Sequence, residues 1–216
     1  MRAFEHAGCY LYSMRAFVLV LLPCLLLAGC ITAPPSNPSN LCSIFREKDG
    51  WYDDAKEARQ RWGAPIPVQM SIIYQESRFE GDAAPPRNKL FWVIPWTRIS
   101  SAYGYSQALD STWGAYKDDA GHPFADRDDF GDAADFVGWY VDQSHKILGI
   151  SKADAYSQYL AYYLGQGGYR QGLYRSKPWL RRAASRVASR SNTYGAQLSS
   201  CRAELERGGH WVTAPP

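Results

Sequence analysis

The sequence lacks a surplus of charge of either sign. Its 216 residues include 24 basic and 21 acidic side chains, giving a formal net charge of +3, and no block of like charge stands out. Domains that bind nucleic acid usually concentrate positive charge on one face or along one stretch of the chain. This near balance favours no nucleic-acid partner, and we expect none.

Histidine is scarce, and the sequence has no motif that would hold a metal ion. His122, His145 and His210 are not near another histidine or a cysteine at ligand spacing. The acidic residues of 118–129 do not have the spacing of a calcium loop. The glycines of 165–168 lack the Lys-Ser/Thr pair and the preceding strand of a phosphate loop. We therefore expect neither a metal ion nor a cofactor.

The one long apolar run of the sequence is short for a transmembrane helix. Residues 16–28 follow Met14 and Arg15 and precede Gly29 and Cys30. A helix that crosses a bilayer needs roughly 20 apolar residues, so a transmembrane anchor is the weaker alternative. A charged start, an apolar stretch and small residues before a cleavage site at Cys30 are typical of a secretory signal peptide, which we predict over residues 1–29. The first four residues of the chain recur from Met14 onward, which makes Met14 an alternative start.

Leu-Ala-Gly-Cys, which ends at Cys30, resembles the bacterial lipobox, whose cysteine becomes the lipidated first residue of the mature protein. The resemblance implies a lipid anchor at Cys30 and a domain that faces the periplasm. By analogy with such lipoproteins, Ile31 in place of an acidic residue implies the outer membrane. The uncharged, Pro- and Ser-rich residues 31–41 predict an extended tether that reaches about 30 Å. The predicted domain then spans residues 42–206, followed by a tail over 207–216.

Few cysteines remain once the predicted signal peptide and the lipidated residue are set aside. Cys42 and Cys201 are left, one near each end of the mature chain. In an oxidising compartment a lone pair of cysteines usually forms a disulfide. We predict this bond, which would close a loop of about 160 residues and contribute at most roughly 5 kcal/mol. Two buried thiols are the alternative.

The sequence also lacks internal repeats and any useful length of the alternating pattern that predicts strands. Its apolar residues recur at helical spacing instead. We predict helices over residues 51–62, 67–79, 105–116, 129–148, 152–164 and from 178 to about 205. The predicted class is therefore all-α, with one domain. A short hairpin within the irregular, apolar segment 82–103 remains open.

Glu76 lies near the end of the short apolar run 70–79. On a helix it shares one face with Ile72 and Ile73, four and three residues before it. Apolar surroundings disfavour the ionised form of a carboxyl group, so such a residue can stay protonated near neutral pH and donate a proton. The alternative is a solvated glutamate at a frayed helix end.

Three short motifs follow one another along the chain, and each is weak when taken alone. They are Glu76-Ser77, then Gly104-Tyr105-Ser106-Gln107, then Ala161-Tyr162-Tyr163-Leu164-Gly165. Together they resemble the soluble lytic transglycosylase (SLT) family, whose pattern is a Glu-Ser pair, a Gly-Leu-Met-Gln-like turn and Ala-Tyr-Asn-Ala-Gly. The resemblance covers roughly residues 64–175. It implies a goose-type lysozyme-like fold that cleaves the glycan strands of peptidoglycan.

The resemblance also assigns roles to residues. Glu76 matches the catalytic acid, Gln107 the glutamine that lines the cleft, and Tyr162 the tyrosine whose hydroxyl bonds to the catalytic glutamate. The remaining positions of the motifs are expected to support the site or the substrate: Ser77, Tyr105, Ser106, Tyr163 and Gly165. Ser106 and Tyr163 depart from the family pattern, which has methionine and asparagine there.

The sequence offers no obvious second carboxylate, although most glycosidases use two. The resemblance implies a reaction in which Glu76 alone serves as acid and then as base, and in which the sugar's own 6-hydroxyl closes a 1,6-anhydro ring. The alternatives are a muramidase that uses water and a non-catalytic lipoprotein that binds peptidoglycan. In each case we expect a monomer.

Overall fold

The computed structural model describes residues 33–85, 87–90, 94–98 and 100–207, with the backbone alone between 87 and 98. The predicted signal peptide (1–29), the start at Met14, the lipidated Cys30 and almost all of the tail over 207–216 lie outside the described residues. Among the residues described, no helix is both long enough and apolar enough to cross a bilayer.

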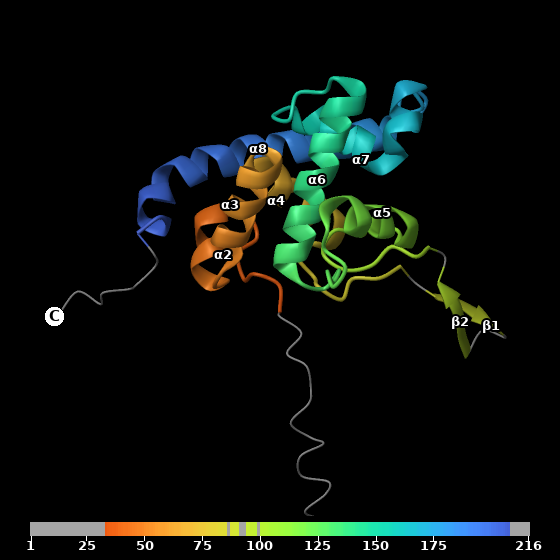
Figure 1. Cartoon of the computed structure of the whole chain (residues 1–216), viewed down its shortest axis with the longest axis horizontal. Coiled ribbons are helices and arrows are strands. Elements are labelled where there is room, and N and C mark those ends of the chain that lie inside the picture. The colour runs from red at the N-terminus through yellow and green to blue at the C-terminus, as the bar shows by residue number, and fades with distance from the viewer. Residues whose placement is uncertain (1–32, 86, 91–93, 99, 208–216) are drawn as a thin grey trace, which may run out of the picture. The chain divides into compact units, whose positions relative to one another are not determined.

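Seven helices account for most of the part of the chain that the structure describes (Figure 1). They are α2 (Leu41–Glu47), α3 (Trp51–Trp62), α4 (Ile66–Ser77), α5 (Asp110–Ala120), α6 (Phe130–Leu148), α7 (Ala155–Arg170) and α8 (Pro178–Leu205). The all-α class is confirmed. Two short strands, β1 (Arg87–Leu90) and β2 (Ile94–Arg98), pair antiparallel and form a hairpin. The hairpin lies within the segment 82–103, for which the sequence analysis left this possibility open.

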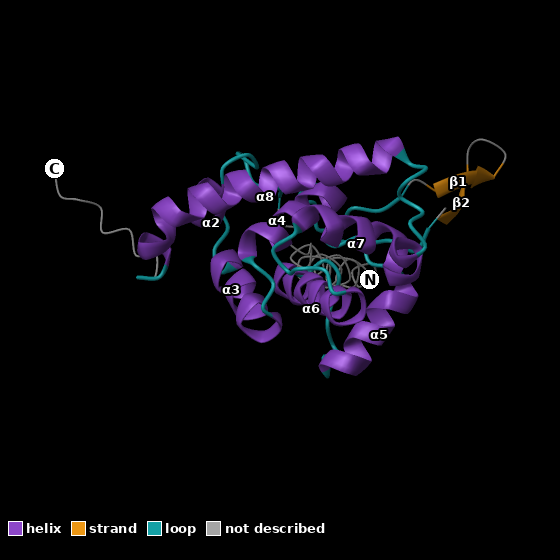
Figure 2. Ribbon diagram, turned by 90° about the horizontal axis from the view of Figure 1, so that it is seen from above, coloured by secondary structure: helices purple, strands orange, loops and turns teal. Residues whose placement is uncertain are grey.

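Helix α4 is the buried centre of the domain, and it carries Glu76. Figure 2 shows it between α6 and α8, and it also contacts α3 and α7. Ile72 and Ile73 are completely buried. The helix ends at Ser77 rather than at Phe79 because Arg78 and Phe79 both have a positive φ, of 58° and 66°, which a right-handed helix cannot contain.

The prediction of a helix from Tyr105 was wrong, since α5 begins only at Asp110. Residues 103–108 form a tight turn in which Gly104 has φ +76° and Gln107 has φ +50°. A Cβ atom at Gly104 would lie 1.9 Å from the backbone oxygen of Arg127, so only glycine fits there. The turn is held against the segment that leads into α6.

Helix α7 begins later and ends later than the predicted limits of 152–164. It begins at Ala155, where the Asp154 side chain accepts a hydrogen bond from the Ser157 amide at 3.1 Å, and it runs to Arg170. Gly165 interrupts it with φ 72° and ψ 160°, so α7 consists of two helical pieces joined at this glycine. The last turn of the first piece carries Tyr162 and Tyr163.

The N-terminal segment packs against the domain, so the prediction of an extended tether over 31–41 was wrong for its described part, residues 33–41. The Tyr194 hydroxyl donates to the backbone oxygen of Pro38, and the Gln197 side chain donates to that of Ser39 at 3.1 Å. Leu41 is completely buried. It opens α2, a seven-residue helix that the sequence analysis missed. A disulfide between Cys42 and Cys201 then joins α2 to α8, with the two Cα atoms 6.1 Å apart.

Candidate active site

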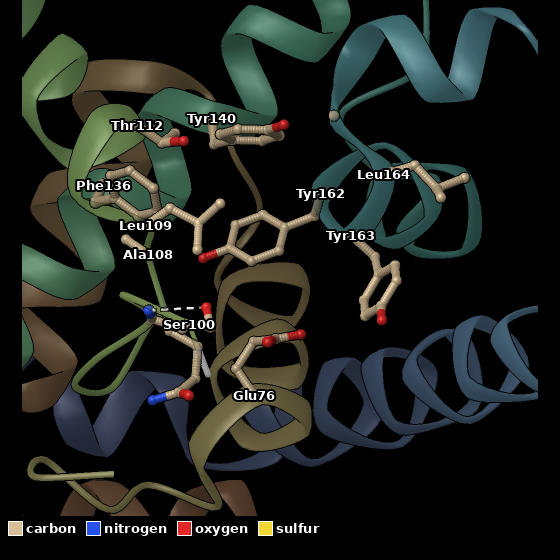
Figure 3. A pocket seen from close by; sticks show the side chains of 13 residues that line it. Glu76, Ser100, Ala108, Leu109, Thr112, Phe136, Tyr140, Tyr162, Tyr163 and Leu164 are labelled. Carbon is tan, nitrogen blue, oxygen red and sulfur yellow. Dashed lines mark hydrogen bonds between the residues drawn. The ribbon is translucent and has the colours of Figure 1, made fainter. Parts of the chain in front are cut away.

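A cleft of about 440 Å³ opens beside the C-terminal end of α4 (Figure 3). Its walls come from α4, from residues 100–112, from α6 and from the first piece of α7. Five of the residues expected at the site line it: Glu76, Gln107, Tyr162, Tyr163 and Gly165. Segments that lie far apart in the sequence therefore meet around one carboxyl group.

Glu76 projects into this cleft from the last turn of α4. Its side chain is half-buried, and its Oε1 atom is shielded from solvent without a hydrogen-bond partner among the described residues. The ring of Phe136 and the side chains of Leu109 and Leu164 contribute apolar surface to the same cleft. An enclosed carboxyl oxygen with no donor beside it costs free energy when the group is ionised.

Burial accordingly raises the pKa of Glu76 from its ordinary value of 4.5 to about 7. The Tyr159 hydroxyl acts in the opposite direction, because its hydrogen bond stabilises the ionised form. A carboxyl group with this pKa is present in both protonation states at neutral pH. It can therefore both give and accept a proton under the same conditions.

The raised pKa of Glu76 predicts a pH-dependent stability for the Glu76→Gln variant. Because the folded state holds the proton up to about pH 7 and the unfolded chain releases it near 4.5, the wild type loses stability as the pH rises between these values. Glutamine never ionises, so we expect the variant to be about 3 kcal/mol more stable than the wild type at pH 8 and nearly equal to it at pH 4. Urea unfolding at both pH values measures this difference. An equal difference at the two values would contradict the assigned pKa.

Tyr162 does not make the predicted hydrogen bond to Glu76. Its hydroxyl donates to the backbone oxygen of Ser106 at 2.6 Å, and in Figure 3 it points away from the carboxyl group. The 103–108 turn brings that carbonyl into reach, and a hydroxyl has only one proton to donate. Tyr162 thus fastens α7 to the turn, while Tyr159, one turn earlier on the same helix, interacts with Glu76.

Sequence reasoning missed Tyr159. Its spacing of three and four residues before Tyr162 and Tyr163 places all three on one face of α7. That spacing could have identified Tyr159 as a candidate site residue. Burial, followed by the charge of Glu76, raises the pKa of the Tyr159 hydroxyl, which therefore remains a proton-bearing donor.

Gln107 lines the cleft, but its side-chain amide is used to hold the backbone. The Nε2 atom donates to the backbone oxygen of Ala83 at 2.7 Å and to that of Gly104 at 2.9 Å. These bonds tie the turn to the segment that follows α4. The position of the turn relative to the end of α4 is therefore fixed.

Three other expected site residues do not line the cleft. Ser77 is buried, and its hydroxyl donates to the Ile73 backbone oxygen at 3.2 Å. Tyr105 is buried in the core, with its ring edge-on to Trp51 at 5.6 Å between centroids. Ser106 is completely buried, and its hydroxyl has no hydrogen-bond partner among the described residues. These residues shape the structure behind the site.

Glu76 is the only acidic residue among the described residues that line the cleft. Glu80 and Asp82, which follow it closely in the sequence, are exposed outside the lining. Asp110 forms an ion pair with Arg127 at 2.8 Å. Within the described residues, no group of three or more histidine, cysteine or acidic side chains is placed to hold a metal ion.

Comparison with known proteins places the chain in a family. None of the curated proteins compared with it is similar enough to count as a match. A family model described as the transglycosylase SLT domain matches residues 18–201, which include every element that lines the cleft. Because this match spans most of the sequence, the chain belongs to the transglycosylase SLT domain family.

Proposed function

We propose that this protein is a lytic transglycosylase that cuts the β-1,4 bond between N-acetylmuramic acid and N-acetylglucosamine in peptidoglycan. The cut leaves a 1,6-anhydro-muramic end, and Glu76 serves as the single acid and base. The family supplies the class of enzyme. The observation that carries the finer proposal is the lone cleft carboxyl group whose pKa burial raises to about 7.

In the first step, protonated Glu76 donates its proton to the oxygen of the glycosidic bond. The bond to C1 of the muramic sugar then breaks, and the N-acetylglucosamine leaves with a hydroxyl group. A donor is most effective when its pKa lies near the working pH, which is the position of Glu76. The acetamido oxygen of the muramic sugar stabilises the cation at C1, so the enzyme needs no nucleophile of its own.

In the second step, the Glu76 carboxylate takes the proton from the 6-hydroxyl of the same sugar. O6 then bonds to C1 and displaces the acetamido oxygen, which closes the anhydro ring. Glu76 ends the cycle protonated, as it began. The apolar surface from Phe136, Leu109 and Leu164 favours this internal attack because it disfavours water beside C1.

The two alternatives are less well supported by the site. A muramidase of the usual kind needs a second carboxylate about 5 Å or 6.5–9.5 Å from the first. The described lining offers only Glu76. A non-catalytic binder gains nothing from a carboxyl group whose ionisation is disfavoured, and such a site costs stability without a compensating role.

Product analysis distinguishes the three functions. Purified protein is incubated with peptidoglycan, and the soluble products are identified by mass spectrometry. Anhydro-muropeptides support the transglycosylase, since they are lighter than the hydrolytic products by one water molecule. Reducing ends would support the muramidase, and the absence of products would support a binder.

We also propose that Cys30 carries lipid and holds the domain at the periplasmic face of a membrane, more specifically the outer membrane. The lipobox-like Leu-Ala-Gly-Cys supports this, and the disulfide of the folded domain suits an oxidising compartment. In cells fed radiolabelled palmitate, we expect label on the wild type and none on Cys30→Ser. The Cys24→Ser variant is the matched control and should remain labelled. Label on Cys30→Ser would refute the anchor.

A further inference from the structure

Tyr163, which lines the cleft, pairs with a second aromatic side chain, Trp179, which is not among the lining residues. Tyr163 lies on α7, one residue after Tyr162, and Trp179 lies in the first turn of α8. Their ring centroids are 5.2 Å apart at an angle of 83°, an edge-to-face arrangement. Tyr163 is 50% exposed and Trp179 is 47% exposed. Figure 3 shows Tyr163 directed away from Tyr162 and toward α8.

This exposure is unusual for the described aromatic residues, most of which pack in the core. Two leucines on and after α7 also contribute apolar surface. Leu164 lines the cleft, and Leu173, which is 44% exposed, lies beside the same Gly168 as Leu164. An exposed apolar patch that continues from a binding cleft marks a surface that contacts a ligand.

Both rings are held on rigid elements. Pro178 opens α8 directly before Trp179, and Tyr163 sits in the turn before the break at Gly165. Each ring is also oriented by the other. Binding a ligand there requires little further loss of side-chain freedom, because aromatic side chains have few rotatable bonds.

A sugar ring is the ligand that such a pair fits. One face of a pyranose presents a row of C–H groups, which pack against the electron-rich face of an aromatic ring. The indole of Trp179 offers the larger face, and the Tyr163 hydroxyl can exchange hydrogen bonds with the hydroxyls at the sugar's edge. A charged or purely aliphatic partner would not use both the aromatic face of Trp179 and the hydroxyl of Tyr163.

We propose that Tyr163 and Trp179 form a subsite that binds one pyranose ring of the glycan strand beyond the two sugars at the scissile bond. The proposal rests on the proposed function, because it requires a glycan strand in the cleft. Tyr163 lines the cleft that holds Glu76, so a strand leaving the cleft on this side passes over the aromatic pair. The subsite adds affinity for long strands and leaves the proton transfers to Glu76.

The test measures binding separately from catalysis. In a Glu76→Gln background, the affinity for the N-acetylglucosamine hexamer is measured by calorimetry. Trp179→Ala and Tyr163→Ala are each expected to weaken binding roughly tenfold, and Trp179→Phe, which keeps a ring, roughly threefold. The matched control is Phe124→Ala, which removes an aromatic ring that is 96% exposed outside the cleft lining and should leave the affinity unchanged. In the active protein, Trp179→Ala should raise KM more than it lowers kcat.

Thermal unfolding of each variant shows whether it is folded. If folded Trp179→Ala and Tyr163→Ala proteins bind the hexamer as tightly as their parent, the subsite is refuted. It is also refuted if the substitutions change only self-association or binding to phospholipid vesicles, since another partner would then cover the pair. If the wild type releases no anhydro products but hexamer binding still depends on Trp179, the proposed reaction fails and the subsite stands.

Discussion

Glu76→Gln is expected to lower the release of anhydro-muropeptides about a thousandfold or more. General acid and general base catalysis each contribute typically between a hundredfold and ten-thousandfold, and in the proposed mechanism Glu76 performs both steps. Glutamine has nearly the same size and shape but cannot exchange a proton at neutral pH. The variant should therefore keep its fold and its affinity for glycan strands while losing turnover.

The control is Glu80→Gln, an identical change four residues further along the chain. Glu80 is exposed and does not line the cleft, so this variant should keep the wild-type rate. Both proteins are assayed by mass spectrometry of the products from the same peptidoglycan. A Glu76→Gln variant that still released anhydro products at a tenth of the wild-type rate would rule out the single-carboxyl mechanism.

Replacing both Cys42 and Cys201 with serine is expected to lower the free energy of unfolding by about 4 kcal/mol. The disulfide joins residues 159 positions apart, so it restricts the unfolded chain over most of the domain. Neither cysteine lines the cleft, and the folded variant should keep its activity. Urea unfolding of the oxidised wild type and of the double variant measures the difference.

Reductant provides the control for this second prediction. It should destabilise the wild type to a similar extent and leave the double-serine variant unchanged. Two free thiols at Cys42 and Cys201 in wild-type protein that is denatured without reduction would contradict the bond itself.

The local pattern of the sequence was enough to predict the setting of Glu76. Ile72 and Ile73 lie four and three residues before it, and both are completely buried beside it on α4. Helical periodicity predicts this setting because residues three and four apart in the sequence lie on the same face of a helix. The long helices α6 and α8 were predictable for the same reason, since each has a continuous apolar stripe.

Contacts between separate elements could not be predicted in this way. Which hydroxyl reaches Glu76 depends on how α7 docks on α4, and spacing along α7 does not distinguish Tyr159 from Tyr162. The prediction of a helix over 105–116 wrongly included residues 105–108, which belong to the turn at Gly104. Only the close approach of the Arg127 backbone, a tertiary contact, shows that the chain must turn there.

If the proposed lipid anchor is present, the packing of the N-terminal segment on the domain limits how far the active site can lie from the membrane. The Lys48 side chain donates to the backbone oxygen of Ala33, and the Tyr194 hydroxyl donates to that of Pro38. The chain is therefore packed on the domain from residue 33 onward. If Cys30 carries the lipid, only Ile31 and Thr32 separate it from this attachment. Three successive peptide units span at most about 11 Å. A linker this short between the lipid and the domain would confine cleavage to the layer of cell wall next to the bilayer.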